Sequence, residues 1–262
     1  MKLSIITVNL NNSEGLLKTI RSVQNQVFKE FELIVIDGAS TDNSLEIIQQ
    51  NNDIIQYYLS EKDHGIYNAM NKGIQRAIGE YCLFLNSGDS FYDEFVLKNV
   101  FSQISGNESI VYGNSYKIKP HYRRVIKYKP KLTLYDFYKT VPALHHQASF
   151  IKRELFSKYG LYDEKIQIIA DWEFFFRVII LNEVETKYID LIVSTFDGTG
   201  LSNSLPKGSD MRMKANIMKD NILSENFPGY ILSDYQMFDE MVSRSSVFRR
   251  MMNKLKYFSL KL

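Results

Sequence analysis

The amino-acid sequence predicts an α/β fold, in which helices flank a mostly parallel central sheet and a helical extension follows at the C-terminus. Short runs of β-branched residues alternate with helical patterns over the first hundred residues, which is typical of βαβ units with right-handed crossovers. The chain has 262 residues, of which 45% are hydrophobic and 24% charged, and can therefore bury a sizeable core. Polar residues follow the end of each predicted strand.

Four strands and three helices are predicted in the first hundred residues. The strands are LSIITV, ELIVID, IIQYYL and EYCLFL, and the helices cover residues 16–27, 41–50 and 65–78. The strand runs are rich in β-branched and aromatic residues and are bounded by turn residues. Because parallel strands end at the same edge of a sheet, ligands of such sheets bind at the carboxyl ends of the strands.

Composition and charge exclude several classes of function. Lys and Arg number 32 against 30 Asp and Glu, a net charge of +2, so the chain lacks the positive excess of a nucleic-acid-binding protein. The single cysteine, Cys82, excludes an internal disulfide and is expected to be a buried thiol. The start MKLSIITVNLNN turns polar too early for a secretory signal, and no stretch reaches the roughly 18 apolar residues of a membrane span. We expect a cytoplasmic protein, with contact to the cytoplasmic face of a membrane left open.

The polar residues at the strand ends predict a shared site. Thr7 and Asn9 follow the first strand, Asp37 the second, Glu61 and Asp63 the third, and the turn from Asn86 to Asp89 the fourth. Each has an ordinary explanation as a helix cap or a turn residue. Together they would crowd several carboxylates at one edge of the sheet, which favours a binding site.

The chemistry of that edge favours a divalent cation. No G-x-G-x-x-G follows the first strand, so the chain lacks a glycine cradle for a pyrophosphate. Carboxylates that face a phosphate would repel it unless a cation lay between them, and Mg²⁺ or Mn²⁺ prefers such oxygen ligands. Asp89 is the first candidate for a metal ligand, because Gly88 would allow a tight turn that points it out of the sheet.

Several segments resemble a known family. IITVNLNN, FELIVIDGASTDNS, SEKDHGIYNAMNKGIQRAIGEY, FLNSGD and HHQASFIKRELFSKYGLYDEKIQIIADWEFFFR are similar, in order, to the motifs of family 2 glycosyltransferases, which have the Rossmann-like GT-A fold of nucleotide-diphospho-sugar transferases. The resemblance implies that Asp37 reads the nucleotide base and that Asp89 holds the metal on the diphosphate. Asn86 replaces an acid of the usual D-x-D-like motif, which leaves Asp89 as the principal protein ligand. The residues implied in binding the sugar donor are Thr7, Asn9, Asp37, Asp63, Gly65, Asn68, Asn71, Lys72, Asn86 and Ser87.

The resemblance also implies a catalytic carboxylate in IIADWEFFFRVII. Asp171 would be the general base that takes the proton of the attacking sugar hydroxyl; the alternative is a helix N-cap or first-turn acid. Glu173, two residues along the helix, does not share a face with it and is expected to be solvated or salt-bridged, or to face the sugar. His146, Trp172 and Glu173 are the candidates for the acceptor site or pocket wall.

Three segments of the second half keep two interpretations each. Residues 109–133 read as a hairpin with recurring Lys and Arg, either a solvated edge or an arm that meets an anionic acceptor or lipid headgroup. The loop VSTFDGTGLSNS either folds over the substrates or is a plain surface loop. The tail SRSSVFRRMMNKLKYFSLKL reads as a basic amphipathic helix that binds a membrane surface or packs on protein.

These inferences predict a division into three parts and one function. Residues 1–105 would bind the nucleotide-sugar, residues 106–205 would bind the acceptor and catalyse transfer within the same domain, and residues 206–262 would form the helical extension. The resemblance implies an inverting, metal-dependent glycosyltransferase that moves a sugar from a nucleotide donor, a UDP-sugar, to a growing, lipid-linked glycan in polysaccharide biosynthesis. A nucleotide-sugar binding module without transfer activity and a sugar nucleotidyltransferase are the alternatives.

Overall fold

The computed structural model describes residues 1–119, 121–139, 142–197 and 210–227. The chain forms two compact units, Met1–Ala215 and Asn216–Leu262. The second unit contains the C-terminal part of helix α9 (Asp210–Asn226), so helical structure does begin in the predicted extension. The predicted amphipathic stripe of residues 247–262 lies outside the described residues, as do residues 198–204 of the predicted loop VSTFDGTGLSNS. The first five residues of that predicted loop, 193–197, are instead the end of a strand, Thr186–Asp197. The division of the first unit at residue 105 stays a prediction.

The first half of the sheet is parallel, as predicted. Its strands β1 (Leu3–Asn9), β2 (Phe31–Asp37), β3 (Ile55–Ser60) and β4 (Tyr81–Phe84) lie in the order β3-β2-β1-β4. The connecting helices are α1 (Ser13–Gln24), α2 (Ser44–Gln50) and α3 (Ile66–Arg76). The register places Asn9 opposite Asp37, and Asp37 opposite Ser60. The ends of these three strands therefore meet at one level of the sheet.

The second half adds strands of both directions to the same sheet. They are β5 (Ser90–Phe91), β6 (Ile110–Lys119), β7 (Tyr122–Ile126), β8 (Ser149–Lys152) and β9 (Thr186–Asp197), with β6 and β7 forming the predicted hairpin. The helices are α4 (Val96–Phe101), α5 (Leu134–Lys139), α6 (Glu154–Tyr159) and α7 (Ala170–Phe175), and α7 continues as a π-helix over Phe176–Leu181. Strand β8 lies antiparallel between β4 and β6, so its start lies beside the carboxyl end of β4. The segment before β8 therefore reaches the predicted site.

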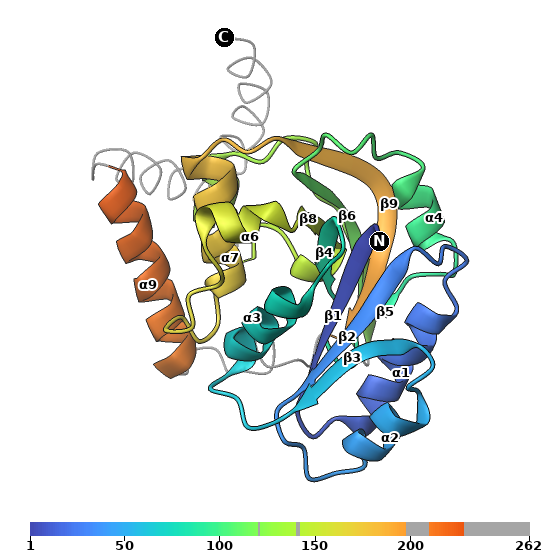
Figure 1. Cartoon of the computed structure of the whole chain (residues 1–262). Coiled ribbons are helices and arrows are strands. Elements are labelled where there is room, and N and C mark those ends of the chain that lie inside the picture. The colour runs from blue at the N-terminus through green and yellow to red at the C-terminus, as the bar shows by residue number, and fades with distance from the viewer. Residues whose placement is uncertain (120, 140–141, 198–209, 228–262) are drawn as a thin grey trace. The chain divides into compact units, whose positions relative to one another are not determined.

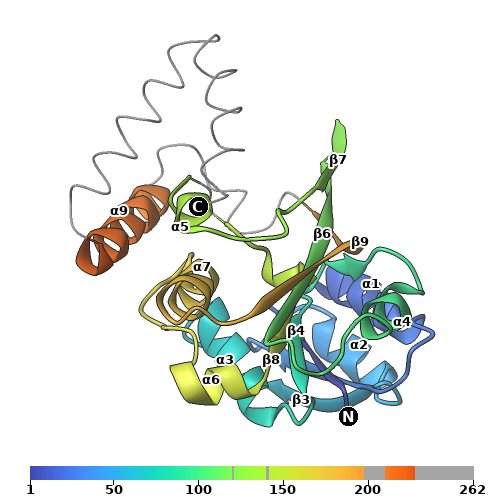
Figure 2. The same ribbon diagram turned by 90° about the horizontal axis from the view of Figure 1, so that it is seen from above.

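Helices cover both faces of the sheet. Figure 1 and Figure 2 show α1, α2 and α4 on one face and α3, α6 and α7 on the other. An apolar cluster joins residues of β1, β2, β4 and α1 under the first face. The alternate residues of β1 and β2, such as Ile6 and Ile36, lie against α3 on the other face, so these two strands are buried along their whole length. Cys82 lies in β4 and is fully buried, as predicted.

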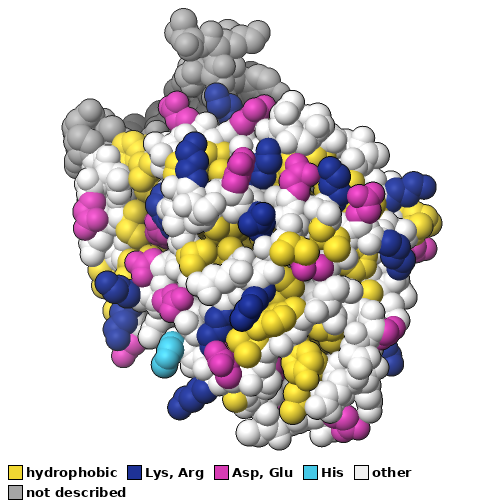
Figure 3. All heavy atoms as spheres, in the orientation of Figure 1, with side chains coloured by type: hydrophobic (Ala, Val, Ile, Leu, Met, Phe, Trp, Pro, Cys, Tyr) yellow, Lys and Arg dark blue, Asp and Glu magenta, His cyan; other side chains and the backbone are white. Residues whose placement is uncertain are grey.

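The surface shows no concentration of one charge on the face of Figure 3, where Lys and Arg alternate with Asp and Glu. None of the helices in the described ranges combines the length and the apolar composition that a membrane span needs.

Candidate active site

The turn after β4 is built around a glycine, as the sequence predicts. Gly88 has a φ of 100°, in the left-handed region where a Cβ is disfavoured. The amide of Asp89 donates to the carbonyl of Asn86 across 2.8 Å and closes the turn. Helix α1 holds the turn through two hydrogen bonds: Lys18 donates to the Gly88 carbonyl at 2.7 Å, and Thr19 donates to the Asp89 carbonyl at 2.6 Å. The turn is therefore held by its backbone, which leaves the Asp89 side chain available.

The carboxylate of Asp89 is half-buried, and no protein group in the described ranges pairs with it. Among the described residues it accepts no hydrogen bond and joins no ion pair. Burial raises its pKa to about 7, although the charges of His146 and Lys18 oppose that rise. A carboxylate with this environment is typical of a functional site, because a purely structural carboxylate is normally paired where it is buried.

Asp89 suits a cation, but it stands alone as a ligand. In the described part of the chain no group of three His, Cys, Asp or Glu side chains could hold a metal ion. A hard divalent cation takes six or more oxygen ligands, so one carboxylate would have to be supplemented by a bound ligand and by water. This agrees with Asn86 standing where a second acid is usual.

Across from Asp89, His146 and Asp171 form a hydrogen-bonded pair. Nδ1 of His146 lies 2.8 Å from Oδ2 of Asp171. Oδ1 of Asp171 accepts from the Tyr67 hydroxyl and from the Trp172 amide, both at 2.9 Å. Asp171 thus lies at the start of α7 and is held by α3 and by the turn of residues 146–148 before β8.

The pair is set up as a carboxylate beside a basic imidazole. Burial favours the protonated form of Asp171, but the hydrogen bond and charge of His146, with the bonds from Tyr67 and Trp172, outweigh it and lower the pKa of the carboxyl. Burial likewise opposes the charge on His146, but Asp171, and then the charge of Asp89, raise the pKa of the imidazole. His145, its neighbour, is held neutral, because burial lowers its pKa to about 3.

Asn86 connects the pair to the turn that carries Asp89. Its Nδ2 lies 3.3 Å from Nε2 of His146, on the opposite side of the ring from Asp171. Its Oδ1 is buried without a hydrogen-bond partner among the described residues. Asp171, His146, Asn86 and Asp89 therefore follow one another along the carboxyl edge of the sheet.

The structure gives Asp37 an internal role that the sequence did not predict. Its Oδ1 accepts from Asn9 Nδ2 at 2.8 Å and from Ser40 Oγ at 2.5 Å, and its Oδ2 accepts from the Ser40 amide at 2.9 Å and from Ser60 Oγ at 2.7 Å. The side chain is fully buried, and these bonds use the roughly four lone-pair positions of a carboxylate. In this conformation Asp37 joins the ends of β1, β2 and β3, and its role in reading the base stays a prediction.

Three further predicted donor-binding residues also serve the fold. Thr7 is fully buried and donates to the Leu85 carbonyl at 2.8 Å, and Asn9 donates to Asp37 and to the hydroxyls of Ser40 and Ser44. Asn71 is buried in α3, donates to the Tyr162 carbonyl and to Glu164, and accepts from the Tyr162 amide. These contacts give Thr7 and Asn71 roles in holding the fold, and their part in donor binding stays a prediction.

The remaining predicted donor-binding residues stay accessible at the sheet edge. Asp63 caps the Gly65 amide at 2.9 Å, and a Cβ on Gly38 would lie only 2.6 Å from its Oδ2. Lys72 pairs with Glu61 at 2.7 Å, and Asn68 donates to Glu164 at 2.9 Å. Ser87 donates to the Asn12 carbonyl at 3.0 Å. A cavity of about 220 Å³ opens here, lined by residues 64–68, 164, 166 and 167.

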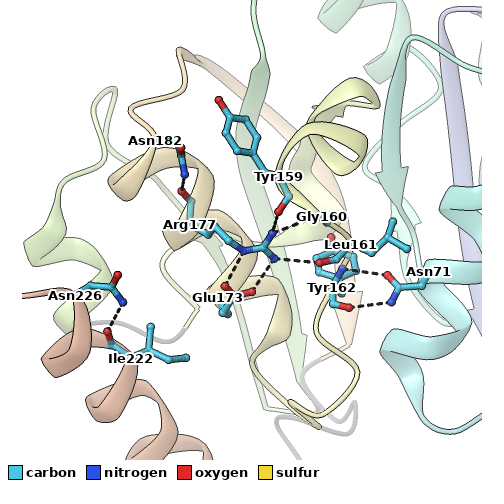
Figure 4. Close-up of polar contacts among 10 residues, drawn as sticks. All are labelled: Asn71, Tyr159, Gly160, Leu161, Tyr162, Glu173, Arg177, Asn182, Ile222 and Asn226. Carbon is cyan, nitrogen blue, oxygen red and sulfur yellow. Dashed lines mark hydrogen bonds and ion pairs between the residues drawn. The ribbon is translucent and has the colours of Figure 1, made fainter.

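Glu173 is salt-bridged, which agrees with one of the two predicted alternatives. Its carboxylate receives two bonds from Arg177, at 2.8 and 2.9 Å. Figure 4 shows the same guanidinium facing the carbonyls of Tyr159, Gly160 and Leu161. Arg177 therefore fixes the chain reversal after α6, next to the Tyr162 backbone that Asn71 holds.

Trp172 is a core residue, which corrects its prediction as part of a pocket wall. Its side chain is 1% exposed, its Nε1 donates to the Phe137 carbonyl at 3.2 Å, and its ring stacks on Phe176. An aromatic residue on the apolar side of α7 has no surface left for a ligand.

Sequence reasoning missed Tyr67 and Lys18. Tyr67 lies on the buried side of α3, and its hydroxyl donates to Asp171 and to the Ile168 carbonyl. The one signal was a buried aromatic with a polar tip, which needs a partner but does not reveal which. Lys18, on α1, gave no signal, because a lysine on an exposed helix face is usually solvated.

Comparisons with known proteins agree with this arrangement. The model of the family described as "Glycosyl transferase family 2" matches residues 4–160. A "PGL/p-HBAD biosynthesis glycosyltransferase" of Mycobacterium bovis is 31% identical over 212 residues, which cover 77% of this chain and 79% of the relative. An "Uncharacterized glycosyltransferase" of Mycobacterium tuberculosis is 34% identical over 203 residues, which cover 76% of each.

Solved structures show the same fold at low identity. S. aureus TarS 1-349 in complex with UDP has a TM-score of 0.64 and 18% identity, over 86% of this chain and 70% of that one. In the structure of the same fragment without a named ligand, the match spans 61% of its length. A mannosyltransferase of Pyrobaculum calidifontis, in complex with GDP-Man and Mn²⁺, has a TM-score of 0.58 and 14% identity, over 99% of this chain and 80% of that one. With its GT-A fold, the chain belongs to glycosyl transferase family 2 and is a glycosyltransferase.

Proposed function

We propose that this glycosyltransferase inverts the anomeric centre of a sugar as it moves it from a UDP-sugar to a growing glycan. The observation that carries the proposal is that an unpartnered carboxylate, Asp89, and a hydrogen-bonded acid–base pair, His146 and Asp171, lie along one edge and are bridged by Asn86. The first group suits a cation on a diphosphate, and the second suits removal of a proton from a hydroxyl. Both functions lower the barrier to a direct displacement.

The residues of the chain divide the reaction between them. The acceptor hydroxyl attacks the anomeric carbon from the side opposite the diphosphate, and the pair of His146 and Asp171 takes its proton. The fixed turn at Gly88 aims Asp89 at the diphosphate, where it would hold Mn²⁺ or Mg²⁺ together with phosphate oxygens and water. Such a cation, when bound, supplies Lewis-acid neutralisation of the charge on the leaving group.

The donor, acceptor and place of action are proposed from similarity. UDP and UDP-GlcNAc are named with TarS, and GDP-Man and Mn²⁺ with the Pyrobaculum enzyme, which supports a nucleotide-sugar donor and a divalent cation. The mycobacterial relative is named for biosynthesis of PGL and p-HBAD. We propose a lipid-linked acceptor in polysaccharide biosynthesis, met at the cytoplasmic face of a membrane.

The test is a ligand screen followed by turnover. A ligand that binds only the folded state raises stability by mass action, so thermal unfolding is measured with UDP, GDP, UDP-GlcNAc and GDP-mannose, each with and without Mn²⁺. We expect the largest shift with the uridine nucleotides and Mn²⁺. Release of nucleoside diphosphate from the best donor then measures transfer to water or to added acceptor glycosides. No shift with any nucleotide, or no release from the tightest-binding donor, would refute the proposal.

A further inference from the structure

The proton of the acceptor can reach either partner of the acid–base pair, and the contacts of Asp171 point to His146. We propose that Nε2 of His146 is the atom that takes the proton of the attacking hydroxyl, and that Asp171 is the positioning residue that holds the imidazole for it. This inference rests on the proposed function, because it assigns the atom that performs one of its steps.

The first argument is that Asp171 has little room to accept a proton. Three hydrogen bonds already end on its carboxylate, from Tyr67, the Trp172 amide and His146, at 2.9, 2.9 and 2.8 Å. A carboxylate offers about four lone-pair positions, so one remains, on the oxygen that faces His146. Asp171 is also only 8% exposed. A sugar hydroxyl could reach the carboxylate only at that one position, on a side chain that is almost fully buried.

The second argument is the tautomer that Asp171 imposes on His146. An ionised carboxylate can only accept, so the short contact at 2.8 Å requires a proton on Nδ1 of the imidazole. In the neutral ring the basic lone pair is therefore on Nε2, where it accepts from Nδ2 of Asn86 at 3.3 Å, a long contact that the acceptor hydroxyl would replace. That atom points away from Asp171 towards Asn86, in the segment that carries Asp89. Nε2 is thus the basic atom of the pair.

The third argument is the amide at position 86. An amide can donate from its NH₂ to the neutral Nε2, and it can accept on its carbonyl oxygen from Nε2–H once the ring is protonated. The buried, unpartnered Oδ1 of Asn86 is available for the second state. A carboxylate at this position could bind only the protonated ring and would keep the proton there before reaction. An amide at position 86, where the family motif has an acid, can therefore bind His146 both before and after the ring takes the proton.

The charged and titratable groups that face His146 favour the protonated product. Burial opposes the charge on the ring, but the hydrogen bond and charge of Asp171 raise the pKa of the imidazole, as does the charge of Asp89, an effect that a cation held by Asp89 would reduce. His145 is neutral and contributes no competing charge.

The step balances in atoms and electrons. The O–H bond of the acceptor breaks, and its electron pair supports the new bond from oxygen to the anomeric carbon. The bond from that carbon to the diphosphate oxygen breaks, and its pair leaves with the diphosphate. The proton is held on Nε2 as an imidazolium paired with Asp171, and it passes to water after the glycan leaves.

The test uses two amide variants that replace different halves of the imidazole. In His146→Asn the side-chain NH₂ lies near the place of Nδ1 and can still donate to Asp171, but nothing replaces Nε2. In His146→Gln the longer chain reaches towards Nε2 and cannot accept a proton either. Turnover is measured as release of nucleoside diphosphate from the donor found in the ligand screen, with donor affinity measured by calorimetry with Mn²⁺.

We expect both variants to lose roughly 10²–10⁴-fold in kcat with donor affinity near that of the wild type, and to lose the acid limb of the pH profile that protonation of Nε2 produces. If His146→Asn keeps wild-type turnover, His146 only positions Asp171 and the inference is wrong. If the wild type itself releases no diphosphate, it is the proposed function that fails.

A spectroscopic measurement on the wild type is independent of turnover and of variant folding. The chain has four histidines, so ¹⁵N-histidine labelling with His146→Asn for assignment isolates one ring. Above its titration range the His146 ring should carry its proton on Nδ1 and none on Nε2. A neutral ring with the proton on Nε2 would overturn the inference, because that atom could not then accept another proton.

Discussion

Nδ1 of His146 donates to Oδ2 of Asp171 across 2.8 Å, although the two residues are 25 positions apart in the chain. The bond joins the turn before β8 to the first turn of α7. The Tyr67 hydroxyl of α3 donates a second hydrogen bond, to the other oxygen of the same carboxylate. Three elements that are distant in sequence therefore hold one carboxylate. A change at any of them should affect catalysis before it affects binding of the nucleotide.

The contrast between Asp171 and Glu173 separates catalysis from stability. Asp171→Asn keeps the shape of the side chain but loses the negative charge that orients the His146 ring and raises the pKa of its imidazole. We therefore expect kcat to fall by roughly 10²–10⁴-fold while donor affinity stays near that of the wild type. Glu173→Gln should leave turnover near normal and lower the free energy of unfolding by roughly 1–3 kcal/mol, because it weakens the bonds from Arg177. Paired rate measurements and urea unfolding of both variants test this. A dead Glu173→Gln beside an active Asp171→Asn would reverse the assignment.

Asp89→Asn should abolish the metal-dependent part of UDP binding and leave the fold intact. Since no hydrogen bond or ion pair found among the described residues ends on this half-buried carboxylate, its replacement by an amide should keep or raise the free energy of unfolding. Calorimetric titration of UDP with and without Mn²⁺, together with urea unfolding, measures both quantities. Asp53→Asn, which changes an exposed carboxylate in the loop before β3, is the matched control and should bind as the wild type does. Unchanged Mn²⁺-dependent affinity in Asp89→Asn would remove Asp89 from the site.

Asp37 should stabilise the fold in a pH-dependent way. Burial raises its pKa, but the bonds from Ser40, Ser60 and Asn9 outweigh burial and leave the pKa lowered. A lowered folded-state pKa means that the stabilisation is complete above the unfolded value, about 3.9, and is lost as the pH falls through the folded value. The difference in unfolding free energy between wild type and Asp37→Asn should be constant above about pH 5 and shrink below about pH 4.

Urea unfolding over a pH series measures that difference, and UDP and GDP titrations at neutral pH accompany it. Loss of UDP affinity in Asp37→Asn without loss of stability would support Asp37 as a residue that reads the base. A difference in stability that stays constant down to pH 2 would contradict the role of its charge.

The C-terminal tail keeps its prediction from sequence, since it lies outside the described residues. Removal of the residues after Ser243 should shift the protein from vesicle-bound to free while donor hydrolysis persists, because the basic amphipathic stripe is separate from the strand-end site. Flotation with anionic liposomes at low and high salt is the measurement. Full-length protein that does not bind vesicles would favour packing on protein instead.

The fold of the first hundred residues could be predicted because its signals are local. The strand Leu3–Asn9 and the helix Ile66–Arg76 can each be recognised from the order of apolar and polar residues within a short stretch of chain. Parallel pairing then brings the strand ends together without further information, and a glycine before an acid was enough to predict the turn that presents Asp89. The family resemblance drew on the same local motifs.

Only the tertiary structure decided which polar side chains form hydrogen bonds within the protein and which stay available to a ligand. Asp37 and Asp89 look alike in the sequence, since both are acids at strand ends. Asp37 accepts hydrogen bonds from Asn9 of β1, from Ser60 of β3 and from Ser40 in the loop after its own strand, whereas no hydrogen bond found among the described residues ends on the Asp89 carboxylate. The insertion of β8 beside β4 brings His146 to Asp171, and α3 brings Tyr67 across 104 positions. Hydrogen bonds between distant segments depend on packing, and no local pattern encodes them, so the acid–base pair was visible only in the folded chain.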